Sequence, residues 1–328
     1  MKNNNIIIVA GEPYSVFFEI FFKTFKKKFF KNLKNPIILI ASKKVLYKQM
    51  IRLNYNLKIN EIFFNEINKI KIDNKKINIL NFNFNFEKTF DKISSKSNNY
   101  INNCCNLAIK IIKEKGAKAL INGPIDKKFF LKKKYPGMTE YFAAKTNKTN
   151  QEVMLIYNKK LAVSPITTHL PLKKIFKKIS KEKIIFQVKK INKFYKKYLK
   201  MNPYIALTGL NPHCETSDKF SEEEKILTPA VKQLKKNGIK ITGPHPADTI
   251  FLKKNYKLYD VIIGMYHDQV LTPFKTLYGF KAINITIGLP FIRITLDHGP
   301  NNKMVGKNLS TPTSLIEAIN FIKNLRDI

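Results

Sequence analysis

Short apolar runs of four to six residues recur along the chain, and longer amphipathic stretches separate them. This alternation constrains the fold most, because strands that alternate with helices pack into a mostly parallel sheet. We therefore expect an α/β fold. The predicted strands are residues 6–10, 36–41, 119–121, 153–157, 162–165, 204–208, 261–265 and 282–286. The predicted helices include residues 15–27, 106–115, 174–199 and 221–237, the last opening with a capping box of Ser221 and Glu224. Residues 56–85 have the least regular pattern.

Length and composition set the class of protein. A chain of 328 residues is long enough for two domains or one large α/β unit, and 44% hydrophobic with 12% aromatic residues excludes a disordered chain. No apolar run approaches the ~20 residues of a membrane span, and the first apolar run is too short for the core of a signal peptide. We expect a soluble, cytoplasmic protein without a membrane partner. Three cysteines, two of them adjacent, indicate neither a disulfide framework nor a CxxC metal site.

The charge is strongly positive, with 60 Lys and Arg against 23 Asp and Glu, a net +37. Such a surface attracts phosphates regardless of sequence, which raises the question of nucleic-acid binding. Only three of the basic residues are arginine, and the lysines are spread over almost the whole length. A base-reading surface would use arginine and concentrate its charge. We therefore favour a lysine-coated, solvated surface with no specific nucleic-acid partner; an acidic protein partner is the remaining alternative.

Three predicted strands end in polar clusters that contain a histidine. These clusters are Thr167-Thr168-His169, Asn211-Pro212-His213 and Tyr266-His267-Asp268. Ligands of open α/β sheets bind beyond the carboxyl ends of the strands, so the three imidazoles can converge there. Three imidazoles suit a catalytic metal site with an open position for substrate. Their spacing matches no short motif, so ordinary loop histidines remain the alternative.

Arg293 and Lys275 are candidate anion-binding residues. Arginine offers a planar fork for a carboxylate or phosphate, and Arg293 stands where lysine is otherwise almost universal. A buried pair with Asp297 is the structural alternative. Lys275 lies eight residues after His267 and could add a point charge or a titratable amine, although a surface position is the alternative. Nucleotide and hydrolase signatures such as GxGxxG, GxxxxGK[ST], HExxH and GxSxG do not occur.

Several ordered segments together resemble the 4-hydroxythreonine-4-phosphate dehydrogenase family of pyridoxal phosphate synthesis over nearly the full length. The segments are Gly11-Glu-Pro13, Asn122-Gly-Pro-Ile-Asp-Lys127, Gly137-Met-Thr-Glu-Tyr141, Thr167-Thr-His-Leu-Pro-Leu172, Gly209-Leu-Asn-Pro-His213, Gly243-Pro-His-Pro-Ala-Asp-Thr249, Met265-Tyr-His-Asp-Gln269 and residues 284–299.

The resemblance implies two α/β/α domains of the isocitrate and isopropylmalate dehydrogenase type. The first domain would comprise residues 1–125 plus 286–328, and the second residues 126–285. It also implies a homodimer with the active site in the interdomain cleft at the dimer interface. A divalent metal (Zn, Mg or Co) would be held by His169 and His213 of one subunit and His267 of the other.

By the same resemblance, Thr139, Lys275, Asn284 and Arg293 would contact the substrate, with Lys275 also catalytic. The substrate would be 4-phosphooxy-L-threonine, a small phosphorylated amino acid. Its oxidation by NAD would give 2-amino-3-oxo-4-phosphooxybutanoate, which loses CO2 to form 3-amino-2-oxopropyl phosphate. The family resemblance assigns no cofactor-binding residue.

The sequence departs from the family pattern in three places. Met138 replaces a histidine, so one expected phosphate donor is missing and affinity is expected to fall. Residues 14–18 lack the small residues that usually follow Gly-Glu-Pro, and residues 300–305 differ where the family is expected to touch the dinucleotide. A non-catalytic binding protein that keeps the fold is therefore the alternative function. His245 is one conceivable substitute for the missing donor, and a surface-loop histidine is the other interpretation.

Overall fold

The computed structural model describes residues 4–132, 134–214 and 221–325. The chain divides into two compact units, which we call unit 1 (residues 1–150 and 289–328) and unit 2 (residues 151–288). Residues 126–150, which the predicted boundary assigns to the second domain, lie in unit 1. Hydrogen bonds to helix α4 (Asn98–Lys115) hold them there, from Asn98 Nδ2 to the Phe129 carbonyl (2.9 Å) and from Tyr141 Oη to Asn102 Oδ1 (2.9 Å).

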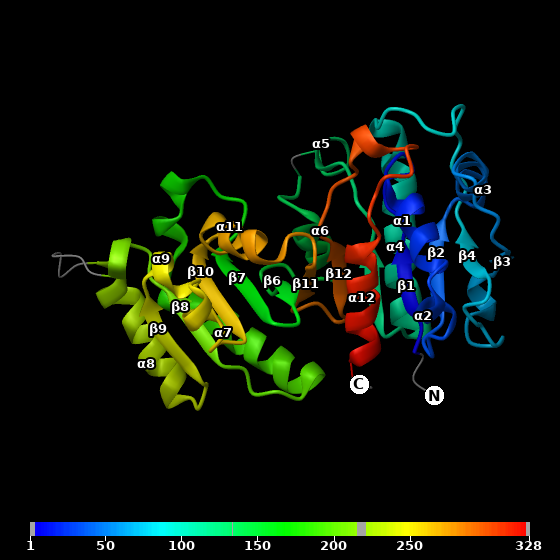
Figure 1. Ribbon diagram of the computed structural model, residues 1–328. Coiled ribbons are helices and arrows are strands. Elements are labelled where there is room, and N and C mark those ends of the chain that lie inside the picture. The colour runs from blue at the N-terminus through cyan, green and yellow to red at the C-terminus, as the bar shows by residue number, and fades with distance from the viewer. Residues whose placement is uncertain (1–3, 133, 215–220, 326–328) are drawn as a thin grey trace. The chain divides into compact units, whose positions relative to one another are not determined.

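Unit 1 is built on a parallel sheet whose described strands have the order β3-β4-β2-β1-β5-β12. In Figure 1 the strands lie side by side with helices packed against them. The strands are β1 (Ile6–Val9), β2 (Ile37–Ala41), β3 (Ile59–Glu61), β4 (Ile77–Asn81), β5 (Ala119–Asn122) and β12 (Arg293–Leu296). The helices are α1 (Phe17–Phe25), α2 (Lys28–Lys31), α3 (Lys43–Arg52), α4 (Asn98–Lys115), α5 (Lys127–Phe130), α6 (Met138–Lys145) and α12 (Thr313–Asn324).

Unit 2 is built on a mixed sheet of order β11-β6-β7-β10-β8-β9, in which β6 is antiparallel to both of its neighbours, β11 and β7, and β7, β10, β8 and β9 are parallel to one another. Its strands are β6 (Val153–Asn158), β7 (Leu161–Thr167), β8 (Ile205–Thr208), β9 (Ile241–His245), β10 (Val261–Tyr266) and β11 (Ile283–Ile287). Its helices are α7 (Lys181–Phe194), α8 (Thr228–Lys236), α9 (Ala247–Ile250), α10 (Lys253–Tyr256) and α11 (His267–Tyr278).

The central strand of unit 1 shows why the apolar runs become parallel strands. β1 reads Ile-Ile-Ile-Val, and all four residues are buried. A continuous β-branched run is typical of a strand covered on both faces, because such side chains suit an extended backbone and need burial on each side. Helix α1 then packs its phenylalanines into the core. The predicted α/β fold with a mostly parallel sheet is therefore confirmed.

Some element boundaries differ from the predictions. The helix predicted over residues 174–199 was wrong at its start: α7 begins at Lys181, because the Ser180 side chain accepts a hydrogen bond from Lys183 N and caps it. Two short 3₁₀ turns (Leu172–Lys174 and Phe176–Lys178) precede it. At the predicted capping box, Glu224 N donates to Ser221 Oγ, and a π-helical turn (Glu223–Leu227) runs into α8. The irregular residues 56–85 contribute β3 and β4.

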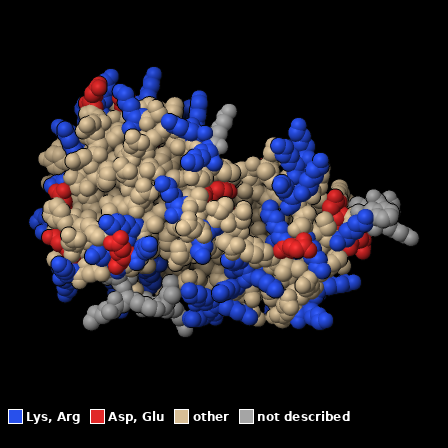
Figure 2. Space-filling view, turned by 180° about the vertical axis from the view of Figure 1, so that it is seen from behind, with Lys and Arg blue, Asp and Glu red and all other residues tan. Residues whose placement is uncertain are grey.

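The described helices include none that is both long and apolar enough to cross a membrane. Lys and Arg side chains are scattered over the face shown in Figure 2, interspersed with uncharged residues. Cys104 and Cys105 are buried on α4, and burial raises the pKa of each thiol. Neither Cys104 nor Cys105 forms a disulfide.

Candidate active site

The three predicted metal-binding histidines follow strands that are neighbours in the sheet of unit 2. β10 lies between β7 and β8 and is parallel to both. His169 comes two residues after β7, His267 directly after β10, and His213 five residues after β8. Because parallel strands end at the same edge, the fold places all three loops on that edge.

The imidazoles are arranged as a pair and a third ring. The ring centroids of His169 and His267 are 6.0 Å apart within one chain. His213 is exposed and has a positive φ of 55°. Within the described part of the chain, no group of three or more His, Cys, Asp or Glu side chains lies close enough to hold a metal ion. A site shared with His267 of a second subunit stays a prediction.

Two of the three histidines face an aspartate through Nδ1. His267 Nδ1 is 2.6 Å from Asp268 Oδ1, and His213 Nδ1 is 3.6 Å from Asp248 Oδ2. A carboxylate on Nδ1 keeps the proton there and leaves the lone pair of Nε2 for a metal. The donor set therefore fits a divalent metal that prefers imidazole.

Gln269 ties the loops of this edge together, although the sequence alone gave it no role. Its Oε1 accepts from Thr208 Oγ1 (2.8 Å) and Met265 N (2.7 Å), and its Nε2 donates to the Gly209 carbonyl (2.7 Å). Thr167 Oγ1 also donates to the Met265 carbonyl (2.7 Å). One side chain thus fixes the ends of β8 and β10 relative to each other.

Glu223 holds the loop before His213. Its carboxylate accepts from Leu210 N (2.8 Å) and from both Asn211 N (2.9 Å) and Asn211 Nδ2 (2.8 Å). Burial raises the pKa of Glu223, but the hydrogen bonds from Asn211 and Leu210 together outweigh it and the pKa is lowered. The loop is therefore anchored on an ionised carboxylate.

Lys275 and Asn284 also belong to unit 2. Lys275 lies on α11 two turns after His267, half-buried, with its Nζ 5.7 Å from the centre of the Phe280 ring. Asn284 lies on β11, and its Oδ1 has no hydrogen-bond partner although it is buried. A buried amide oxygen without a partner suits a ligand that donates a hydrogen bond.

Arg293 is buried in unit 1, 1% exposed, and its guanidinium is held on several sides. Nε donates to Asn122 Oδ1 (2.8 Å), Nη1 donates to Thr139 Oγ1 (3.3 Å), and Cζ lies 4.9 Å from the centre of the Phe142 ring. Burial lowers the pKa of Arg293 to about 9, against the attraction of Cys105 and Glu140. The structure thus brings Arg293 and Thr139 together.

Helix α6 begins at Met138, next to this guanidinium. Its N-cap is Gly137, and no side chain caps the helix. The first N–H groups of a helix favour an anion. Met138 is buried and its thioether cannot donate a hydrogen bond.

His245 lies in unit 2, and its Nε2 is engaged by Thr242 Oγ1 (2.8 Å) and Tyr259 Oη (3.3 Å).

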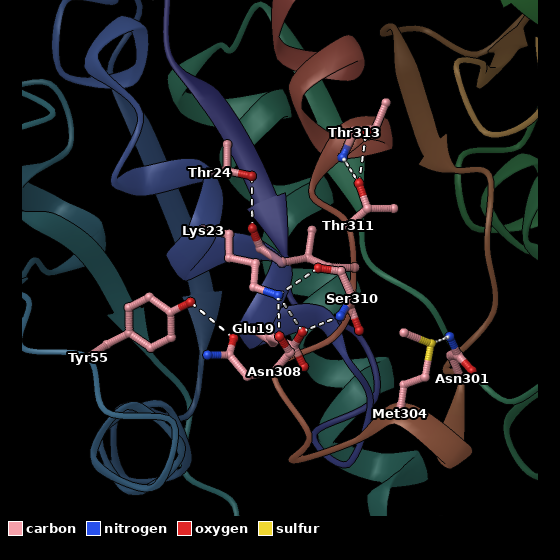
Figure 3. A network of polar contacts seen from close by, with 11 residues as sticks. Glu19, Lys23, Thr24, Tyr55, Asn301, Met304, Asn308, Ser310, Thr311 and Thr313 are labelled. Carbon is pink, nitrogen blue, oxygen red and sulfur yellow. Dashed lines mark hydrogen bonds and ion pairs between the residues drawn. The ribbon is translucent and has the colours of Figure 1, made fainter.

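The two altered segments of unit 1 contact each other. Val16 N donates to the Pro300 carbonyl (3.1 Å). The residues that follow the second segment are held on α1 by Lys23. Its Nζ donates to Glu19 Oε1 (2.9 Å) and to the carbonyls of Asn308 and Ser310 (2.8 Å each). Figure 3 shows Lys23 pointing into this cluster. The departures at 14–18 and 300–305 are thus one connected region.

Comparison with known proteins assigns this arrangement to a family. A sequence model described as "Pyridoxal phosphate biosynthetic protein PdxA" matches residues 32–322. The chain belongs to the PdxA family. A curated relative from Sulfurihydrogenibium sp. (strain YO3AOP1), named 4-hydroxythreonine-4-phosphate dehydrogenase, is 39% identical over 319 residues, 96% of each chain. The predicted family resemblance is confirmed.

Solved structures show the same fold as this PdxA family member. A putative 4-hydroxythreonine-4-phosphate dehydrogenase from Salmonella typhimurium superposes with a TM-score of 0.84 at 26% identity, over 98% of this chain and 100% of that one. The Klebsiella pneumoniae enzyme of that name gives 0.83 at 26% identity, over 97% and 98% of the two chains. The PdxA fold thus covers both units.

Proposed function

We propose that the chain is a 4-hydroxythreonine-4-phosphate dehydrogenase of pyridoxal phosphate biosynthesis, and so an oxidoreductase. Membership of the PdxA family across both units supports this activity. The structural observation that carries the proposal is the pairing of His267 and His213 with Asp268 and Asp248 through Nδ1. It prepares imidazoles as metal ligands, which an ordinary loop histidine does not need.

The phosphate of the substrate is assigned to unit 1. Arg293 supplies a buried, positively charged fork, Thr139 a hydroxyl, and the uncapped start of α6 its N–H groups. These donors fit a dianion better than surface lysines do, because they are fixed before the ligand arrives. They also supply donors that the family takes in part from the histidine replaced by Met138.

The reacting end is assigned to unit 2. His169, His213 and His267 would hold a divalent cation (Zn, Mg or Co), His267 being contributed by the second subunit of a homodimer. When bound, the cation supplies a Lewis acid and NAD a hydride acceptor. Asp268 and Asp248 orient the imidazoles, and Asn284 Oδ1 accepts a hydrogen bond from the substrate.

The reaction is oxidation of the C3 hydroxyl of 4-phosphooxy-L-threonine. The hydroxyl loses its proton and C3 loses a hydride, which gives 2-amino-3-oxo-4-phosphooxybutanoate. Lys275 is the residue that we assign to proton transfer and to holding an anionic group at this end. The product is a β-keto acid, which loses CO2 readily because the ketone accepts the electron pair, and 3-amino-2-oxopropyl phosphate results.

The test is an assay of the purified full-length protein with substrate, NAD and each divalent cation in turn, followed by NADH formation. Turnover should be lost with a chelator and restored by metal. His213→Ala should lose both metal and turnover. His245→Gln is the matched control, because its imidazole is engaged by Thr242 and Tyr259 and its loss should leave metal content unchanged. Equal metal content and equal activity in His213→Ala and wild type would refute the metal site.

The alternative of a non-catalytic binding protein makes a different prediction. It predicts binding of the phosphorylated substrate or of phosphate with no NADH formed under any metal condition. Met138 and the altered segments at 14–18 and 300–305 are the features that favour it. Measurable turnover by wild type would exclude it.

A further inference from the structure

Asn122 is fixed against Arg293 at the end of β5. It is 1% exposed, its Oδ1 accepts from Arg293 Nε (2.8 Å) and Thr295 Oγ1 (3.2 Å), and its Nδ2 donates to the Gly123 carbonyl (3.1 Å). Arginine has no acceptor atom, so the amide atom that faces Nε must be the oxygen. The amide is therefore held at both ends and aimed at the guanidinium.

Close packing fixes the backbone that carries this amide. A Cβ on Gly123 would lie 2.1 Å from the Ala10 carbonyl oxygen, so only glycine fits between β5 and the end of β1. Ala10 and Gly123 thus hold the strand end in place, and Asn122 cannot move away from Arg293 without disturbing β1. The position of the amide is a property of the sheet rather than of a flexible loop.

The acceptor that Asn122 offers is neutral. Buried arginines are usually neutralised by a carboxylate, because an uncompensated charge is costly in the interior. Here the group that faces Nε is the neutral amide of Asn122, although the charges of Cys105 and Glu140 also act on the buried guanidinium. A carboxylate in place of the amide would compensate it internally and leave less charge for a ligand.

We propose that Asn122 is a positioning residue for anion binding: it fixes Arg293 through Nε without neutralising it, so that the guanidinium keeps its charge and direction for the substrate phosphate. The inference rests on the proposed function, because it names the residue that prepares the proposed phosphate site. With Nε held, Nη1 faces Thr139 at the start of α6. Asn122 acts through Arg293 and does not itself touch the substrate.

The test replaces the amide by an isosteric carboxylate in the full-length protein. Asn122→Asp should weaken binding of inorganic phosphate, measured by calorimetry, by about 10- to 150-fold, as expected for loss of one charged hydrogen bond. KM for the phosphorylated substrate should rise by a similar factor while kcat changes less. Asn102→Asp is the matched control, because it makes the same substitution at another amide of unit 1 whose Oδ1 accepts a side-chain hydrogen bond, from Tyr141 Oη.

A second variant keeps the inference testable if Asn122→Asp does not fold. Asn122→Ala adds no charge and removes the acceptor. Its affinity for phosphate should therefore lie between that of wild type and that of Asn122→Asp. The inference would be overturned if both variants bound phosphate as tightly as wild type. The same holds if Asn122→Asp is unfolded and Asn122→Ala binds as tightly as wild type, or if wild type itself binds no phosphate. Loss of phosphate binding in the variants of a protein without turnover would support it and refute only the proposed function.

Discussion

Replacing Glu12 by Gln should make the stability of the protein less dependent on pH. Glu12 is 2% exposed in the loop after β1, where its Oε2 accepts from Ser97 Oγ (2.7 Å). Burial raises its pKa from 4.5 to about 7, and the charge of Asp126 adds to the effect. The folded state therefore binds a proton more tightly than the unfolded state does, so this group destabilises the fold as the pH rises from 4.5 to about 7.

The magnitude follows from the shift. A difference of about 2.5 pKa units corresponds to about 3.4 kcal/mol, of which about 2.5 kcal/mol develops between about pH 5 and about pH 8. Glutamine keeps the shape and one acceptor but cannot ionise. The free energy of unfolding of Glu12→Gln minus that of wild type should thus be about 2.5 kcal/mol larger at the higher pH than at the lower one, which means that the variant gains relative stability.

The assay is urea unfolding of both proteins at the two pH values, where the difference between them cancels the effect of the other titrating groups. Glu87→Gln is the control, because it makes the same substitution at an exposed position of the same unit. A difference between wild type and Glu12→Gln that is the same at both pH values would refute the reasoning, since it would mean that the buried carboxyl does not titrate in this range.

Three further predictions concern the proposed site. Arg293→Lys keeps a charge but loses the hydrogen bond from Nε to Asn122, so kcat/KM should fall by a factor that corresponds to about 1.5 to 3 kcal/mol. The same substitution at the exposed Arg52 is the control. An unchanged kcat/KM in Arg293→Lys would assign Arg293 to structure alone. Met138→His should lower KM for the phosphorylated substrate without altering metal content; a rise in KM would mean that the pocket is built around methionine. Asp268→Asn should weaken metal affinity in a titration by about 10- to 100-fold, because it loosens the orientation of the neighbouring histidine; equal affinity would argue against this carboxylate's role.

Local patterns predicted most of the strands because burial of both sheet faces demands a continuous apolar run. Ile6–Val9 and Ile37–Ala41 are recognisable without any partner strand. The start of α7 was less predictable. Residues 172–180 mix lysines with apolar side chains in a pattern that is compatible with an α-helix, yet part of this segment forms two 3₁₀ turns. The cap at Ser180 decides where the α-helix begins. Pattern alone does not reveal which of several possible starts packs on the sheet.

The placement of the three candidate metal ligands at one edge of the sheet was predictable for the same reason as the strands. His169, His213 and His267 each follow a run that reads as a parallel strand, and parallel strands deliver their loops to one edge. The order of those strands was not predictable. Only the structure makes β10 the neighbour of both β7 and β8, and only it brings the rings of His169 and His267 to 6.0 Å.

The sequence by itself determined the fold class, the family and the candidate site residues, because hydrophobic period and motif are local properties of the chain. Tertiary structure alone decided what surrounds those residues. Asn122 meets Arg293 across 171 positions, and Ser97 meets Glu12 across 85. Burial and hydrogen bonding depend on which distant segments pack together, so the environment that sets a charge, an orientation or a pKa appears only once the chain has folded.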